Sequence, residues 1–150
     1  MTQMESSRLI IRELSTAEPA FRAMVTALAD AGLHTTDLHE GTVHYFMLGD
    51  GEAFGGISVA GTTAFLRSIV VTGARYEGTG SALLQHLLVT ARAEAAKEVW
   101  LFTLSAAEFF AKHGFAPQPR TSAPGAIAAT RQFTELCPDS AVLMRCSLGP

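Results

Sequence analysis

The chain has 150 residues and a formal net charge of −3, with 48% hydrophobic and 17% charged residues. A domain of this length can bury about 70% of its unfolded surface, and the apolar content argues against a disordered chain. Its 11 basic residues are scattered along the sequence, whereas a nucleic-acid-binding protein concentrates them on one face. We therefore expect a single domain over residues 1–150 with no nucleic-acid partner.

The sequence also argues against a membrane or secreted protein. No stretch approaches the roughly 18 unbroken apolar residues that a membrane-spanning helix needs. Residues 1–8 lack the basic region and apolar segment of a signal peptide. Two cysteines, Cys137 and Cys146, are too few for a disulfide framework in a chain of this size. These features predict a cytoplasmic protein with reduced thiols and no membrane contact.

The first half of the chain predicts a strand, a helix and three further strands. An apolar run with β-branched members, Arg8–Leu14, suits the first strand. The helix that follows has Ser15 or Thr16 as a candidate N-cap, with Glu18 at capping-box spacing from Ser15 and Gly32 as its stop. Glycine-containing turns then separate three runs that are typical of hairpin strands. These runs are Val43–Leu48, Ala53–Ala60 and Thr63–Val71.

The second half predicts a strand–helix–strand crossover. A glycine-bearing loop leads from Val71 into a helix that reaches about Ala96 and has one apolar face. This face consists of Leu83, Leu84, Leu87, Leu88 and Ala91. The apolar run Val99–Leu104 predicts a strand covered on both faces. The remaining expected elements are a helix over Ala106–Lys112 that ends at Gly114, a strand from Phe115 and a last strand over Ala141–Ser147. Together these elements predict a mixed α/β sheet.

The most informative segment is the glycine-bearing turn between the strand Thr63–Val71 and the helix behind it. Such a turn directs backbone N–H groups to one point at the positive end of a helix dipole, which suits a phosphate or diphosphate. A dinucleotide fingerprint would need a third glycine where Leu83 stands. A Walker A loop would need lysine after Gly80, and Ser81 stands there instead. Both of these phosphate-binding motifs are therefore excluded.

A third phosphate-binding pattern fits the turn. The run Arg75-Tyr76-Glu77-Gly78-Thr79-Gly80 matches R/Q-x-x-G-x-G/A, the signature of the GNAT family of N-acetyltransferases, which the sequence resembles. A second segment, from Thr103 to Phe115, resembles the family's N-x-x-A-x-x-F-Y-x-K-x-G-F pattern. The resemblance covers roughly residues 8–147, and over residues 65–146 the sequence looks like small N-acetyltransferases associated with arsenic-resistance operons. It implies a GNAT fold, in which a mostly antiparallel sheet is splayed between its fourth and fifth strands and flanked by helices.

The resemblance also implies acetyl-coenzyme A as the cosubstrate and an amine that attacks the thioester directly within a ternary complex. The fourth strand would pair with the pantetheine arm, and the Val70 main-chain N–H would stabilise the thioester oxygen. The turn and the helix behind it would bind the diphosphate. The implied cofactor residues are Ser68, Ile69, Val70, Arg75, Tyr76, Glu77, Gly78, Thr79, Gly80, Ser81, Thr103 and Phe110. No metal is implied, and the spacing of His34, His39 and His44 matches neither a helix face nor a strand face.

The sequence departs from the family pattern at several positions. Glu77 puts a carboxylate where many members have a basic residue, and Thr103 replaces an asparagine. Phe110 stands where many members have a tyrosine that protonates the departing thiolate, so either water takes that role or it is not needed. The fourth strand lacks the carboxylate that some relatives use as a base. The base is left open between an ordered water chain and a residue from elsewhere, such as Tyr45 or Glu52.

Arg67 is the candidate acceptor-binding residue, because guanidinium binds carboxylate bidentately and this arginine stands in an otherwise apolar strand. Its alternative interpretation is an ordinary surface or ion-paired arginine. With Tyr45, Arg67 makes up the predicted site for the amine of a small amino acid or a toxic amino-acid analogue. Two other functions stay open, a protein or peptide N-acetyltransferase and a non-catalytic acyl-coenzyme A sensor. The composition is compatible with a homodimer.

Overall fold

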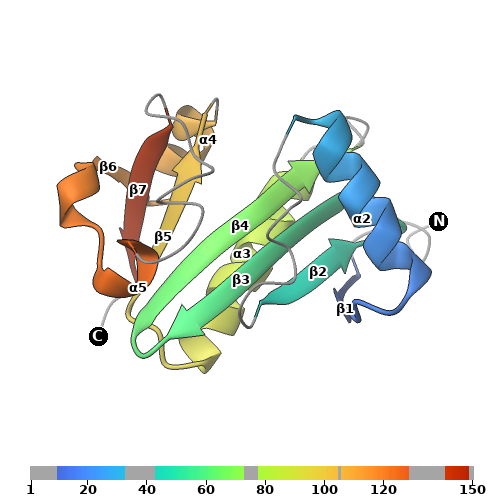
Figure 1. The fold of residues 1–150 in the computed structure, drawn as a ribbon, viewed down its shortest axis with the longest axis horizontal. Coiled ribbons are helices and arrows are strands. Elements are labelled where there is room, and N and C mark those ends of the chain that lie inside the picture. The colour runs from blue at the N-terminus through green and yellow to red at the C-terminus, as the bar shows by residue number, and fades with distance from the viewer. Residues whose placement is uncertain (1–9, 33–42, 73–77, 105, 129–140, 149–150) are drawn as a thin grey trace.

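The computed structural model describes residues 10–32, 43–72, 78–104, 106–128 and 141–148 (Figure 1). Its first elements are β1 (Ile11–Leu14), α2 (Pro19–Asp30), β2 (His44–Leu48), β3 (Ala53–Ala60), β4 (Thr63–Val71) and α3 (Thr79–Ala93). They are followed by β5 (Glu98–Thr103), α4 (Ala107–Lys112), β6 (Ala116–Gln118), the short 3-10 helix η1 (Arg120–Ser122), α5 (Gly125–Ala128) and β7 (Val142–Ser147). Within these ranges no helix is both long and apolar enough to cross a membrane.

The described strands form one seven-stranded sheet in the order β1-β2-β3-β4-β5-β7-β6. Neighbouring strands are antiparallel except β4 and β5, which run parallel. That parallel pair is short, since Thr63 to Phe65 lie opposite Glu98 to Trp100 and the register ends there. Beyond this point β4 and β5 diverge towards their carboxyl ends (Figure 1). The predicted mixed sheet, mostly antiparallel and splayed between its fourth and fifth strands, is confirmed.

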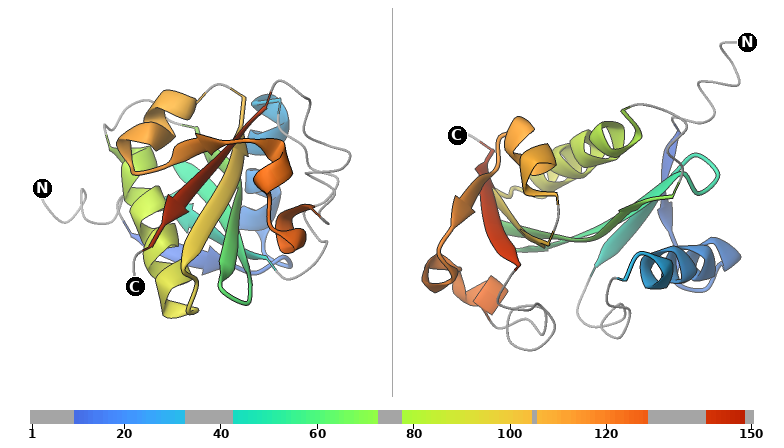
Figure 2. Two further views of the ribbon diagram at one scale, coloured as in Figure 1. Left: turned by 90° about the vertical axis from the view of Figure 1, so that its left-hand side faces the viewer. Right: turned by 90° about the horizontal axis from the view of Figure 1, so that it is seen from above.

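Helices cover both faces of the sheet, with α3 and α4 on one face and α2 and α5 on the other (Figure 2). The buried apolar face of α3 is the one that its spacing predicted, Leu83, Leu84, Leu87, Leu88 and Ala91. These side chains pack with residues of β2, β3, β4, β5 and β7 in the largest core cluster. The opposite face carries two smaller clusters, one beneath α2 and one between β4, β5, β7 and α5. The α3 helix therefore joins the two parts of the sheet that meet at the short parallel pair.

The start of α2 differs from the prediction. Neither Ser15 nor Thr16 caps the helix, which begins at Pro19 with Glu18 in the N-cap position. A residue before proline avoids the helical conformation, and Glu18 is accordingly extended, with φ −93° and ψ 156°. The Ser15 N–H donates to the Glu18 carboxylate at 2.7 Å, so one half of the predicted capping box is present. Gly32 follows the helix with φ +77°, as expected for a stop.

The end of α3 also differs, because the helix ends at Ala93 rather than near Ala96. Ala95 adopts a left-handed φ of +70°, and the Ala96 N–H donates to the Ala91 carbonyl at 3.0 Å. This is a helix-ending arrangement that normally uses glycine. Since alanine occupies the position, the sequence carries no stop signal there. The other described elements begin or end within a few residues of the predicted boundaries.

Candidate functional site

The stretch of β4 that the sequence analysis singled out contains a β-bulge. The register of β4 against β3 slips between Arg67 and Val70, so that Ser68 and Ile69 together face Gly55. Ser68 has a φ of +60°, a left-handed conformation that is uncommon outside glycine. A bulge of this kind disrupts the regular ladder and leaves one residue unpaired. The main chain at Ser68 and Ile69 is therefore displaced from regular pairing with β3.

The other edge of β4 is open along the same stretch. The parallel register with β5 ends at Phe65, whereas β4 itself continues to Val71. Within the described part of the chain, no other strand takes the place of β5 along this edge. An unpaired strand edge presents N–H and C=O groups to which an extended ligand can pair. Val71 at the end of β4 and Leu104 just after β5 also have exposed apolar side chains.

The amino end of α3 follows this strand in the chain. Gly78 occupies the N-cap position with φ +82° and has no side chain that could accept a hydrogen bond from the first turn. A Cβ at Gly78 would meet no atom within 4 Å, so the backbone conformation rather than space requires glycine there. The first helical bond runs from the Ala82 N–H to the Gly78 carbonyl at 2.8 Å. The N–H groups of Gly80 and Ser81 precede it in the first turn and have no acceptor within the helix.

The side chains of this first turn contact the protein itself. Thr79 is buried. A Cβ at Gly80 would lie 3.4 Å from Phe109 Cζ, an ordinary van der Waals distance, so α4 packs beside this turn without requiring a glycine in it. The Ser81 Oγ lies 3.0 Å from His113 Nε2, at hydrogen-bond distance. The turn can therefore offer mainly its backbone N–H groups to a ligand, as the sequence analysis expected.

Two further predicted cofactor residues, Thr103 and Phe110, make structural contacts. The Thr103 Oγ1 accepts a hydrogen bond from the Ala106 N–H at 2.9 Å, which satisfies a donor at the start of α4. The Phe110 ring is buried in the core and packs edge-on against Phe109 and Phe115, with centroids 5.1 Å and 5.7 Å away. The packing interpretation of this aromatic pair therefore fits the described contacts of Phe110.

Tyr45 and Arg67 lie on the same face of the sheet, with Gly56 between them. Tyr45 of β2 is opposite Gly56 of β3, and Gly56 is opposite Arg67 of β4. A Cβ at Gly56 would lie 2.7 Å from the ring carbons Cδ1 and Cε1 of Tyr45, so the ring lies over this glycine. Both side chains are buried, Tyr45 at 2% exposed and Arg67 at 8%. The structure thus brings the two predicted acceptor residues to neighbouring positions.

Aromatic side chains continue this face across β5. Phe65 is opposite Trp100 in the parallel pair, and its ring is edge-on to Phe102 with centroids 6.3 Å apart. The Arg120 guanidinium lies 5.0 Å from the centroid of the Phe102 ring, a cation–π contact. An arginine therefore lies on each side of the divergence, Arg67 in β4 and Arg120 over a side chain of β5.

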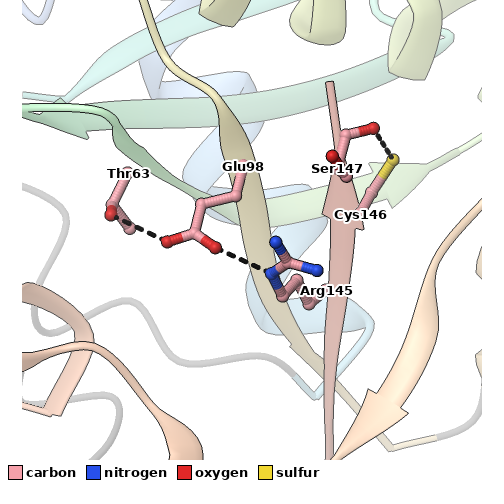
Figure 3. A network of polar contacts seen from close by, with 5 residues as sticks. All are labelled: Thr63, Glu98, Arg145, Cys146 and Ser147. Carbon is pink, nitrogen blue, oxygen red and sulfur yellow. Dashed lines mark hydrogen bonds and ion pairs between the residues drawn. The ribbon is translucent and has the colours of Figure 1, made fainter. Parts of the chain in front are cut away.

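A polar network joins β4, β5 and β7 where the parallel pair begins (Figure 3). The Glu98 carboxylate accepts hydrogen bonds from Arg145 Nε at 2.7 Å and from the Thr63 hydroxyl at 3.2 Å. Partial burial acts to raise the pKa of the Glu98 carboxyl, but these bonds and the neighbouring Trp100 indole outweigh it, so the pKa lies below its ordinary value. The Glu98 carboxylate therefore links β4, β5 and β7 at the end where β4 and β5 are still paired.

A groove of about 380 Å³ lies between α2 and the end of β4. Small and polar side chains of α2 and the last residues of β4 line it: Ala23, Thr26, Ala27, Asp30, Ala31, Val70, Val71 and Thr72. It opens beside the β-bulge. The sequence analysis did not find this groove, because alanines on a helix carry no motif and their partner residues are distant in sequence.

Some of the remaining predicted residues lie within the described parts of the chain and others lie outside them. Glu52, a candidate base, accepts a hydrogen bond from the Asp50 N–H at 2.8 Å in the turn between β2 and β3. The described residues contain no group of three or more His, Cys, Asp or Glu that could hold a metal ion. Outside the described residues lie the loop positions Arg75, Tyr76 and Glu77, as well as His34, His39 and Cys137.

Comparisons with known proteins address the fold. No protein-family model matches the sequence, and no curated protein matches it. Among solved structures, N-acetylglutamate synthase of Neisseria gonorrhoeae, complexed with coenzyme A and N-acetyl-glutamate, matches with a TM-score of 0.73 and 17% identity. The match covers 94% of this chain and 35% of the synthase, so the chain spans about a third of that protein.

Two other solved structures match along nearly their whole length. A Klebsiella pneumoniae protein assigned as an acyl-CoA N-acyltransferase has a TM-score of 0.73 and 18% identity, over 95% of this chain and 99% of its own. An acetyltransferase of the GNAT family from Staphylococcus aureus has a TM-score of 0.67 and 14% identity, over 93% and 99%. The chain therefore has the fold of the GNAT acetyltransferases.

Proposed function

We propose that this protein is an acetyl-coenzyme A-dependent N-acetyltransferase, whose acceptor is the amine of a small amino acid or of a toxic analogue such as those of arsenic resistance. One observation carries the proposal. The open edge of β4, along the bulged stretch Ser68–Val71, leads along the chain to the amino end of α3 at Gly78. Coenzyme A has a matching order, an extended arm with amide groups followed by a diphosphate.

The described residues fit the chemistry of this substrate. The amides of a pantetheine arm can pair with the free edge of β4, as an added strand would. The diphosphate is an anion, which the amino end of a helix favours through its first-turn N–H groups and its dipole. Gly78, Thr79 and Gly80 would bind it through the main chain, and Ser81 and the loop residues Arg75, Tyr76 and Glu77 would complete the site by motif position.

The reaction needs a neutral amine, a stabilised thioester oxygen and a departing thiolate. The Val70 N–H, just beyond the bulge, would donate to the oxygen as the amine attacks the carbonyl carbon. The carbon–sulfur bond then breaks and the thiolate leaves. Phe110 has no proton to give and is buried in the core, so water would protonate the thiolate. The proton lost by the amine would also go to water.

Arg67 and Tyr45 support an acceptor that carries a carboxylate. The buried guanidinium can bind such a group bidentately, and Arg67 directly precedes the bulge in β4. The Tyr45 ring over Gly56 would lie beside the acceptor bound at Arg67. Arg120, over Phe102, offers a second positive group on this face. A peptide acceptor remains the alternative within the same chemistry, and the missing tyrosine at Phe110 gives some support to a sensor.

The function is tested by adding acetyl-coenzyme A and a panel of acceptors to the purified protein. The panel contains amino acids, phosphinic and arsenical amino-acid analogues, and basic peptides, and thiol release and product mass are measured. We expect turnover with small amino acids or their analogues. Turnover with peptides alone would make the protein a peptide acetyltransferase, and tight cofactor binding without turnover would make it a sensor. Absence of binding heat with coenzyme A and acetyl-coenzyme A would overturn the proposal.

Substitution of Arg67 tests the acceptor site. We expect Arg67→Gln to lower kcat/KM for the best amino acid by about 10- to 100-fold, because a hydrogen-bonded charge pair is lost. Activity towards the corresponding amine without the carboxylate should change little. Arg22→Gln, at an exposed position of α2, is the matched control. An equal loss with both acceptors would mean that Arg67 supports the fold rather than the acceptor.

A further inference from the structure

His113 lies beside the amino end of α3, although no motif gives this residue a role. Its Nε2 is 3.0 Å from the Oγ of Ser81, in the first turn of α3. The two residues are 32 positions apart in the sequence. Their contact depends on the packing of α4 against the start of α3, and both side chains are half-buried.

Several contacts hold the His113 imidazole in this place. The Phe109 ring lies one turn earlier in α4, with its centroid 4.9 Å from that of the imidazole. Phe109 in turn packs over Gly80 and edge-on against the buried Phe110. The His113 main-chain N–H donates to the Phe110 carbonyl at 2.9 Å. The imidazole therefore approaches Ser81 from a fixed backbone position with an aromatic side chain at its flank.

The direction of the Ser81–His113 hydrogen bond decides what Ser81 can do. A serine hydroxyl carries one proton. If Ser81 donates this proton to Nε2, it has none left for a ligand. If an Nε2–H donates to Ser81 Oγ instead, the hydroxyl proton is free to point to an acceptor. An anion at the amino end of α3 accepts hydrogen bonds only, so it favours the second arrangement.

We propose that His113 is a positioning residue for the diphosphate of the coenzyme A substrate. Its Nε2–H donates to Ser81 Oγ, and the Ser81 hydroxyl donates to a diphosphate oxygen, which adds one directed donor to the main-chain N–H groups of the helix start. His113 acts through Ser81 and does not itself contact the substrate. This inference rests on the proposed function.

Two substitutions separate hydrogen bonding from packing at this position. His113→Phe keeps a flat ring beside Phe109 but has no donor, whereas His113→Gln keeps an N–H donor of similar reach. We expect His113→Phe to weaken coenzyme A binding about five- to tenfold, the usual effect of losing one hydrogen bond. His113→Gln should bind within about twofold of the unsubstituted protein. Affinity is measured by calorimetry, and circular dichroism checks that each variant is folded.

Two further readouts identify the diphosphate as the group concerned. The dissociation constant of pantetheine, which lacks a diphosphate, is measured by competition with coenzyme A. It should be unchanged in His113→Phe. Ser81→Ala should show the same loss for coenzyme A as His113→Phe, and the double variant should lose no more than either single one, since one chain of hydrogen bonds is broken in each. His86→Phe, on α3 beside Phe46, is the control and should bind normally.

The inference and the proposed function fail in different ways. If the unsubstituted protein does not bind coenzyme A, the proposed function fails and the inference fails with it. If that protein binds and His113→Phe binds equally well, only the inference is overturned. It is also overturned if His113→Gln does not restore the affinity for coenzyme A, or if His113→Phe weakens pantetheine binding to the same extent. Additive losses of affinity in the double variant of His113 and Ser81 would overturn it as well.

Discussion

Gly56 shows at the residue scale how an absent side chain shapes the candidate acceptor site. It lies between Tyr45 and Arg67 across three neighbouring strands. Because it has no Cβ, the Tyr45 ring can lie over the strand, and the Tyr45 ring also meets Phe21 of α2 edge-on at 5.6 Å. The glycine thus allows one side chain to contact both the sheet and the helix that covers it.

Substitution of Gly56 by alanine should therefore be costly. The new Cβ would lie 2.7 Å from two ring carbons of the buried Tyr45, and overpacking of this kind costs about 1–3 kcal/mol. We expect a corresponding loss in the free energy of unfolding, measured in urea. Gly125→Ala is the control, since a Cβ there meets nothing within 4 Å. A Gly56→Ala protein as stable as the parent would contradict this position of the Tyr45 ring.

Single residues were predicted from sequence to different degrees. The left-handed conformation of Gly78 is compatible with the glycine in the signature, because glycine in such a turn commonly serves positive φ. The stretch of β4 that bulges was identified from the family resemblance, but the left-handed conformation at Ser68 was not foreseen, since serine carries no signal for it. The contact of Ser81 with His113 depends on how two helices pack, and no local pattern contains it.

At the scale of elements, Glu98 links three strands where the sheet changes from antiparallel to parallel. It stands in β5 and binds Arg145 of β7 and Thr63 of β4. These contacts lie at one end of the parallel register, and the strands part beyond its other end. The network therefore holds the strands together at the paired end, opposite the end beyond which they diverge.

The lowered pKa of Glu98 predicts a pH dependence of stability. The unfolded chain binds the proton more readily than the folded one, so the stabilisation is complete above the ordinary pKa of about 4.3 and is lost as the pH falls through the lower folded value. We expect Glu98→Gln to be less stable near neutral pH and to lose less stability between about pH 5 and pH 3. Urea unfolding across this range measures the difference.

Glu94→Gln serves as the control for this pH series. Glu94 is exposed at the carboxyl end of α3, where a negative charge gains nothing from the helix dipole. Its pH profile should follow that of the parent protein. Parallel profiles for Glu98→Gln and the parent would mean that the Glu98 carboxylate does not stabilise the fold.

Element boundaries were predictable where turn chemistry is local. The bounds of β3 and β4 match the prediction, because glycine turns flank both strands. The predicted start of α2 was wrong because Pro19 forces the preceding residue out of the helical conformation. The predicted end of α3 was wrong because Ala95 takes the left-handed position after the helix, which glycine usually occupies.

At the scale of the whole molecule, α3 joins two parts of one sheet. Among the described strands, β1 to β4 are paired with β5 to β7 only through the short parallel register. Leu87 of α3 belongs to the cluster that spans both parts and is fully buried. Its Cδ1 would be 3.1 Å from a Cβ at Gly55. Cohesion of the two parts therefore depends strongly on this one helix.

Truncation of Leu87 tests this role of α3. We expect Leu87→Ala to cost about 2–5 kcal/mol, because it removes buried apolar contacts and leaves a cavity. Both parts should unfold together, so circular dichroism and Trp100 fluorescence should give one coincident transition. Val89→Ala, on the exposed side of the same helix, should change stability little. Separate transitions from the two probes would show that the parts are stable independently.

The left-handed backbone at Gly78 bears on how signatures of this kind are interpreted. Any other L-residue would be strained at its φ of +82°, although the space beside it is open. Selection for a stable turn alone is therefore enough to keep this position a glycine. A descendant that had lost its ligand would still retain the glycine for as long as the turn kept its shape, and family surveys that score this position will count such members as enzymes.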